Sequence, residues 1–242
     1  MKRTMLTLPL LSALSLTTLT ACGGGDDTGS AAETTARPKT TASQASPSAD
    51  PAARLAELLV TKAEAGDYDV REPAAGDALA ESQEELRVDK KACAPLAYAT
   101  NYLPVGDPEA SLTHVADKGT TVYTYITLAT YAEGEAEAAM KGLAEAVTSC
   151  ASGYTAKSSK AATTYSSVTK ETSPSKSGAD ESIAAASTVA YKGTQTMRNQ
   201  TFRFGDTIVN YFSINSGGFI HGRSSQAEVP AELVEAQNAK LG

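Results

Sequence analysis

Three extended runs joined by two-residue turns are the feature that most constrains the fold of this chain. The runs are rich in β-branched and aromatic residues, and they cover residues 182–191, 195–204 and 207–215. A turn at 205–206 places Phe202 opposite Val209, on a face that should belong to the core. Because turns this short join antiparallel neighbours, the sequence predicts an antiparallel meander.

Two further groups of extended segments precede this meander. A hairpin is expected in residues 111–131, where Lys118-Gly119 separates two runs, and two more strands are expected at 153–157 and 163–171. Helical spacing is found in residues 54–66, 91–100, 133–150 and 229–242. In the third of these segments, apolar side chains recur at alternating steps of four and three, namely Ala136, Met140, Leu143, Val147 and Cys150. The order of elements predicts an α+β fold, an antiparallel sheet with helices packed on one face, in a single domain over residues 52–242.

The first residues have the layout of a secretory signal. Lys2 and Arg3 precede a short apolar stretch, which ends at Leu19-Thr20-Ala21-Cys22. That tetrapeptide resembles the lipobox of bacterial lipoproteins, in which cleavage occurs before the cysteine and a diacylglycerol is attached to its thiol. Residues 1–21 are therefore expected to be a lipoprotein signal peptide, and Cys22 the site of lipidation.

Residues 22–51 are expected to form a disordered tether. Between Gly23 and Asp50 there is no Leu, Ile, Val, Met or aromatic residue, so the segment has too little apolar surface to offset its conformational entropy. Its Ser, Thr and Pro content also fits an O-glycosylated stalk. The expected membrane contact is thus the N-terminal lipid, with the folded domain on the outer side of the cytoplasmic membrane.

Charge and cysteine content narrow the function further. The net charge is -7 and the domain has no Lys/Arg cluster, which argues against nucleic acid as a partner. With Cys22 lipidated outside the cytoplasm, Cys93 and Cys150 remain, and a disulfide between them is the favoured interpretation. Two buried free thiols and a metal pair are the alternatives.

Four short patterns resemble a family of secreted actinobacterial lipoproteins related to the PknH-like extracellular sensor domain. They are CAPLA at Cys93, the helix that ends at Cys150 before Gly153-Tyr154, SGADESIA at Ser177, and FRFGDTIVNYF. The resemblance implies the fold and an extracytoplasmic role in sensing or ligand binding. It does not carry over a ligand, because the family domain has two disulfides and an attached kinase, whereas this chain has cysteines for one bridge and no kinase.

Catalytic motifs are sparse. The chain has two histidines, His114 in an expected strand and His221 close to Ser224 and Ser225, and neither has ligand spacing to the other. The acidic pairs Glu84-Glu85 and Asp180-Glu181 are typical of solvated turns. Since no phosphate loop, dinucleotide fingerprint, nucleophile elbow or HExxH motif is present, we expect no catalytic residue, cofactor or metal.

Tyrosines on one strand offer a possible ligand surface. Tyr123, Tyr125 and Tyr131 alternate with the aliphatic side chains of Val122, Ile126 and Leu128, so the two sets occupy opposite faces. If helices cover the aliphatic face, the tyrosines line the open side of the sheet and could bind a sugar, a peptide or a lipid head group. The alternative is that tyrosine merely has high β propensity.

The sequence as a whole predicts a non-enzymatic, membrane-anchored lipoprotein that binds a ligand or protein of the cell envelope. An envelope hydrolase that uses His221 and a nearby serine is one alternative. A structural accessory subunit that docks on a membrane complex is the other.

Overall fold

The protein is described by a computed structural model that covers residues 50–173 and 178–242. The expected signal peptide, most of the tether and Cys22 lie outside the described residues. The folded part begins with α1 (Pro51–Leu58), whose N-terminus is capped by the Asp50 side chain. In the described part of the chain, no helix has the length and apolarity needed to cross a membrane.

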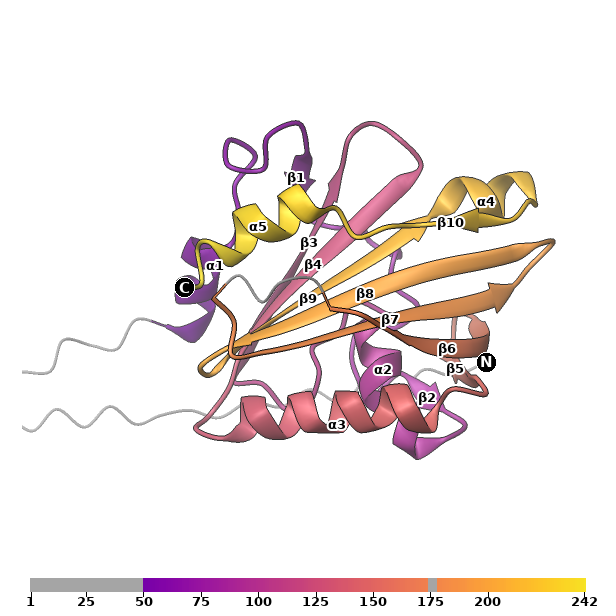
Figure 1. Ribbon diagram of the computed structural model, residues 1–242, viewed down its shortest axis with the longest axis horizontal. Helices are drawn as coiled ribbons and strands as arrows, with labels where there is room; N and C mark the ends of the chain where they lie inside the picture. Colours follow the sequence, from indigo (N-terminus) through magenta and orange to yellow (C-terminus); the bar gives the residue numbers. More distant parts are fainter. Residues whose placement is uncertain (1–49, 174–177) are drawn as a thin grey trace, which may run out of the picture. The chain divides into compact units, whose positions relative to one another are not determined.

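A single large sheet forms the centre of the fold (Figure 1). Its strand order is β1-β3-β4-β9-β8-β7-β6-β5-β2, with all of these pairs antiparallel, and β10 adds a parallel pair with β8. The antiparallel sheet and the α+β class predicted from the sequence are confirmed. The strands are β1 (Asp69–Arg71), β2 (Arg87–Val88), β3 (Ala110–Asp117), β4 (Val122–Thr130), β5 (Tyr154–Lys157), β6 (Ala162–Glu171), β7 (Glu181–Ala190), β8 (Thr194–Phe204), β9 (Thr207–Asn215) and β10 (Ser225–Gln226).

Helices cover both faces of this sheet. On one face lie α2 (Ala94–Ala99), which follows the 3-10 turn η1 (Lys91–Cys93), and the long α3 (Glu135–Ser149). On the other face lie α1 and α5 (Ala231–Asn238), and the short α4 (Ser216–His221) follows β9 (Figure 1). The sequence predicted helices on one face only, and the structure corrects this, because β9 has apolar side chains in both directions.

Alternation along β9 explains the two cores. Ile208 and Phe212 pack under α2 and α3, whereas Val209 and Tyr211 pack under α1 and α5, and all four are at most 2% exposed. The predicted pairing of Phe202 with Val209 is confirmed, and both side chains are fully buried. A strand that is apolar on both faces needs a cover on each side, so two helical layers follow from this strand alone.

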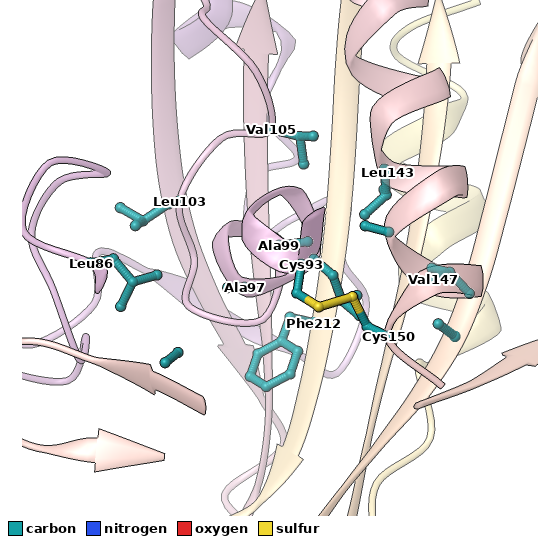
Figure 2. Close-up of a cluster of buried hydrophobic side chains, with 14 of the residues drawn as sticks. Leu86, Cys93, Ala97, Ala99, Leu103, Val105, Leu143, Val147, Cys150 and Phe212 are labelled. Carbon is teal, nitrogen blue, oxygen red and sulfur yellow. A yellow bond between two sulfur atoms is a disulfide. The ribbon is translucent and has the colours of Figure 1, made fainter. Parts of the chain in front are cut away.

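The first helical layer is cross-linked to itself. Cys93 at the end of η1 and Cys150 just after α3 form a disulfide with a Cα–Cα distance of 5.8 Å, as the sequence favoured. Figure 2 shows this bridge beside α3, with Phe212 of the sheet nearby. The apolar stripe of α3 is buried, including Met140, Leu143 and Val147. The disulfide therefore fixes α2 to the C-terminal end of α3.

The second helical layer joins the two ends of the folded chain. The side chain of Gln237 in α5 accepts a hydrogen bond from the Val60 amide at 2.8 Å and donates one to the Leu58 carbonyl at 2.9 Å. Lys240 pairs with Glu64 at 2.9 Å. These contacts hold the first and last helices side by side, as Figure 1 also shows.

Candidate functional site

The three tyrosines proposed for ligand binding lie on the face covered by α2 and α3. Tyr125 is 6% exposed and Tyr131 is 3% exposed, while Tyr123 is half-buried. The Tyr131 hydroxyl donates a hydrogen bond to the Val105 carbonyl inside the core. The idea of an open tyrosine face is therefore corrected, because that face has its own helical layer. Tyr131 is a core residue, and Tyr123 and Tyr125 remain near the surface hollows described next.

Tyr102 occupies a strained position beside these residues. Its φ angle is +62°, in the left-handed region, which costs a side-chain-bearing residue about 1–2 kcal/mol. Its ring stacks on Tyr125 with a centroid distance of 3.6 Å and an interplanar angle of 10°. Its carbonyl accepts hydrogen bonds from the hydroxyls of Thr113 and Thr127, at 3.0 and 3.3 Å. The surrounding strands thus hold Tyr102 in a conformation that tyrosine does not favour.

Two surface hollows meet at Tyr102. They have volumes of about 390 and about 330 Å³ and share Asp77, Tyr102 and Ile214, so they lie side by side. We call them together the tyrosine groove. The first hollow is lined by Arg71, Asp77, Tyr102, Val115, Tyr123, Tyr125, Ile214 and Ser216. The second is lined by residues 76–79 and 100–102, by Lys160, Ala161, Thr163 and Tyr165 near β6, and by Met197, Phe212, Ile214 and Phe219.

The lining of the tyrosine groove combines aromatic rings with charge at its edges. Arg71 at one end is bound to Asp117, and this ion pair raises the pKa of the guanidinium. Lys160 at the other end pairs with Glu81 at 2.5 Å. Burial raises the pKa of the Tyr102 and Tyr125 hydroxyls, so both stay protonated and can donate hydrogen bonds. The groove is suited to hold a flat apolar surface with polar edges.

Another groove, of about 660 Å³, lies elsewhere on the same face, between α3 and the strands β6 and β7. Its lining is mainly aliphatic, with Met140 and Val147 from α3 and Ile183 from β7. Charges of both signs line its two sides, namely Glu137 and Lys141 on α3 and Lys170 and Glu181 on the strands. We take the tyrosine groove as the candidate site because it alone of the two contains aromatic rings and a strained residue.

The histidine and serine residues considered for hydrolysis do not form a catalytic arrangement. His221 is exposed at the end of α4, and the hydrogen bonds in the described residues include none between His221 and either serine. The Ser225 hydroxyl donates to the Gln195 side chain at 2.5 Å, and the Ser224 hydroxyl accepts from the Thr194 amide at 3.0 Å. Both serines therefore tie a loop to β8.

The remaining polar candidates are scattered. His114 lies in β3 opposite Ile126, and burial lowers its pKa; its Nδ1 is buried without a hydrogen-bond partner among the described residues. Asp180 and Glu181 pair with Arg203 at 3.3 and 3.5 Å, and Glu84 and Glu85 are exposed. Over residues 50–173 and 178–242, no group of three or more His, Cys, Asp or Glu side chains could hold a metal ion.

Sequence reasoning missed Tyr102, Asp77 and Arg71. A left-handed tyrosine has no sequence signal, and the segment around Asp77 has no regular secondary structure. Only the fold brings these residues to the end of β4, next to Tyr123. The alternation of tyrosines along β4 pointed to a strand that lines the groove, although it did not show which of the tyrosines reaches the surface.

Comparisons with known proteins bear on the fold. No family model matches the chain, and a search of curated proteins gave no match. Among solved structures, one match covers 78% of this chain and 93% of the other, with 11% identity and a TM-score of 0.48. It is the extracellular domain of PknH from Mycobacterium tuberculosis. The resemblance to PknH-like extracellular domains noted in the sequence thus has a counterpart among solved structures, at low identity.

A second solved structure is also similar. It is an uncharacterized protein from Mycobacterium smegmatis, the Rv0999 ortholog, with 11% identity and a TM-score of 0.34. The alignment covers 79% of this chain and 95% of that one. At this level of identity neither structure identifies a ligand for the tyrosine groove.

Proposed function

We propose that this chain is an extracytoplasmic lipoprotein of the cell envelope whose domain binds a small amphiphilic ligand in the tyrosine groove without turning it over. The signal-like N-terminus and the lipobox-like residues at Cys22 support export and anchoring. The Cys93–Cys150 disulfide fits an oxidising compartment.

The observation that carries the binding function is the joining of two hollows at the strained Tyr102. Backbone strain is kept where the surrounding structure holds it in place, and such positions cluster at binding sites. Relaxing Tyr102 to an ordinary backbone conformation would move its ring off Tyr125. Because Tyr102 lines both hollows, this movement would change the shape of both. The combined groove lies in the volume range of small-molecule sites.

The chemistry of the lining defines the ligand class. Tyr123 and Phe219 offer apolar surface, Arg71 lies at one end of the groove, and Asp77 lines both hollows. A ligand with an apolar ring or sugar face and a polar edge fits this combination, because aromatic rings contact the flat face while hydroxyl and charged groups bind its rim.

The test compares two half-buried tyrosines in the full mature chain. Tyr123 lines the groove, whereas Tyr98 in α2 lines neither hollow. The parent is titrated with three probes, 8-anilinonaphthalene-1-sulfonate, chitotriose and lysophosphatidylglycerol. For any probe that the parent binds, Tyr123→Ala should lower the affinity by about 5- to 150-fold. Tyr98→Ala should change binding less than twofold.

Thermal melts of the same variants separate binding from stability. Tyr123→Ala should keep a melting curve close to that of the parent. Equal affinities of the Tyr123 and Tyr98 variants, at equal stability, would show that the groove is not the binding site. Chemical conversion of any bound probe would contradict the non-enzymatic part of the proposal.

A further inference from the structure

One end of the sheet has an exposed apolar tip. Ile220 is 71% exposed and Tyr191 is 45% exposed, and these are the exposed large hydrophobic side chains of the described residues. Ile220 belongs to α4, and Tyr191 opens the turn between β7 and β8. The ring of Tyr191 lies 5.8 Å from that of Phe219, which links the two segments. We call Tyr191, Lys192, Phe219, Ile220 and Arg223 the α4 tip.

The two segments of the α4 tip are held together rigidly. The Gln195 side chain donates hydrogen bonds to the carbonyls of Tyr191 and Arg223, at 3.3 and 2.7 Å. A Cβ atom on Gly193 would lie 2.7 Å from the Ser224 amide nitrogen, so the turn packs directly against the second segment. The exposed side chains are thus presented by a preorganised surface, which lowers the entropic cost of binding.

Positive charge surrounds the apolar side chains. Lys192 extends over the Tyr191 ring, with its Nζ 5.5 Å from the ring centroid, and Arg223 follows α4. Within residues 182–227 the one acidic residue is Asp206, in the turn at the opposite end of β8 and β9. On the groove side, Asp77 shares a hollow with Phe219, and the acidic partners of Arg71 and Lys160 are engaged in ion pairs. The tip is therefore locally cationic, although the chain has a net charge of -7.

We propose that the α4 tip docks on the anionic lipid surface of the membrane. Apolar side chains flanked by Lys and Arg suit a membrane interface, because the former enter the head-group layer while the latter contact phosphates. An acidic protein approaches such a surface through basic side chains, and at the α4 tip these flank the exposed Tyr191 and Ile220, so charge and apolar exposure together favour this end.

The chain outside the structure is long enough to permit this contact. The α4 tip and α1 lie at opposite ends of the sheet (Figure 1). About 30 residues separate Cys22 from α1, and when extended they reach on the order of 100 Å. A chain anchored at Cys22 can therefore place the tip on the membrane to which it is attached.

The experiment is vesicle co-sedimentation of the full mature chain carrying Cys22→Ser, so that no lipid anchor contributes. Vesicles contain either phosphatidylcholine alone or an equal mixture with phosphatidylglycerol. The parent should bind the anionic vesicles, and the binding should fall when salt is raised from about 0.1 to about 1 M. Ile220→Ser should lower the partition coefficient about fivefold.

The charge variants give a matched comparison. Lys192→Gln with Arg223→Gln should lower the partition coefficient about thirtyfold. The control removes the same charge elsewhere, with Lys91→Gln and Lys157→Gln, both exposed and outside the tip, and should change binding less than threefold. Because Ile220 is mostly exposed, Ile220→Ser should have the same melting temperature as the parent.

Three outcomes overturn the proposal. The first is absence of parent binding to anionic vesicles. The second is binding that the tip and control variants reduce equally. The third is tip-dependent self-association in size-exclusion chromatography without vesicle binding, which would assign the surface to a second copy of the chain.

Discussion

Removal of the Cys93–Cys150 disulfide is expected to lower stability by about 4 kcal/mol. The two cysteines are 57 residues apart, and closing a loop of that length removes about 14 cal/mol/K of entropy from the unfolded chain, which is about 4 kcal/mol at 25 °C. In the folded domain both residues are at most 1% exposed, in the contact between α2 and α3. For a domain of this size the melting temperature should fall by roughly 8–16 °C.

The assay is urea unfolding of the lipid-free chain with Cys22→Ser. The double variant Cys93→Ala and Cys150→Ala is compared with the parent, both oxidised and after reduction. The reduced parent should unfold near the double variant, since both lack the cross-link, and the two should share the slope of free energy against urea. Intact mass establishes that the oxidised parent contains the bridge.

If the double variant were less stable than the fully oxidised parent by under about 1 kcal/mol in free energy of unfolding, the reasoning would be refuted. It would mean that residues 93–150 are already restricted in the unfolded chain, so that the bridge removes little entropy. A loss that appears in the double variant but not in the reduced parent would instead assign the effect to packing in the core of Figure 2.

Two further changes test local features of the domain. The amide of Thr61 and the Lys240 ammonium lower the pKa of Glu64 from 4.5 to about 2. The stability that the Glu64 carboxylate contributes is therefore complete above pH 4.5 and is lost as the pH falls through 2. In urea unfolding at several pH values, the difference in free energy of unfolding between the parent and Glu64→Gln should shrink across that window, and a constant difference would contradict the argument. Lys192 has a φ of +47°, and Asn tolerates that region better, so Lys192→Asn should raise the free energy of unfolding by about 0.5–1 kcal/mol. Lys157→Asn in β5 is the control, and equal effects of both changes would refute the backbone argument.

Much of the sheet could be predicted from alternation and turn chemistry. The third run of the meander, residues 207–215, is β9, and β8 is the run 195–204 with one further residue at its start. The helix expected in 133–150 is α3 at Glu135–Ser149, because its apolar stripe has an unambiguous helical period. These elements are long, and each is specified by its own residues.

The elements that were missed depend on tertiary contacts. β1 and β2 have three and two residues, and they are strands only because β3 and β5 offer paired partners. α4 contains two consecutive glycines, Gly217 and Gly218, and begins where the Asn215 side chain accepts a hydrogen bond from the Gly217 amide. The two-sided cover of the sheet did have a signal, since β9 alternates Ile208 and Phe212 with Val209 and Tyr211.

The contact between α1 and α5 has a consequence for how the domain matures. The Val60 amide donates its hydrogen bond to the side chain of Gln237, which lies 177 residues further along the chain. The apolar face of α1 packs on β3 and β4, whereas the polar contacts of the Leu58 carbonyl and the Val60 amide form only once α5 is in place. In a chain made from its N-terminus, the segment that completes this layer is therefore the last one synthesised.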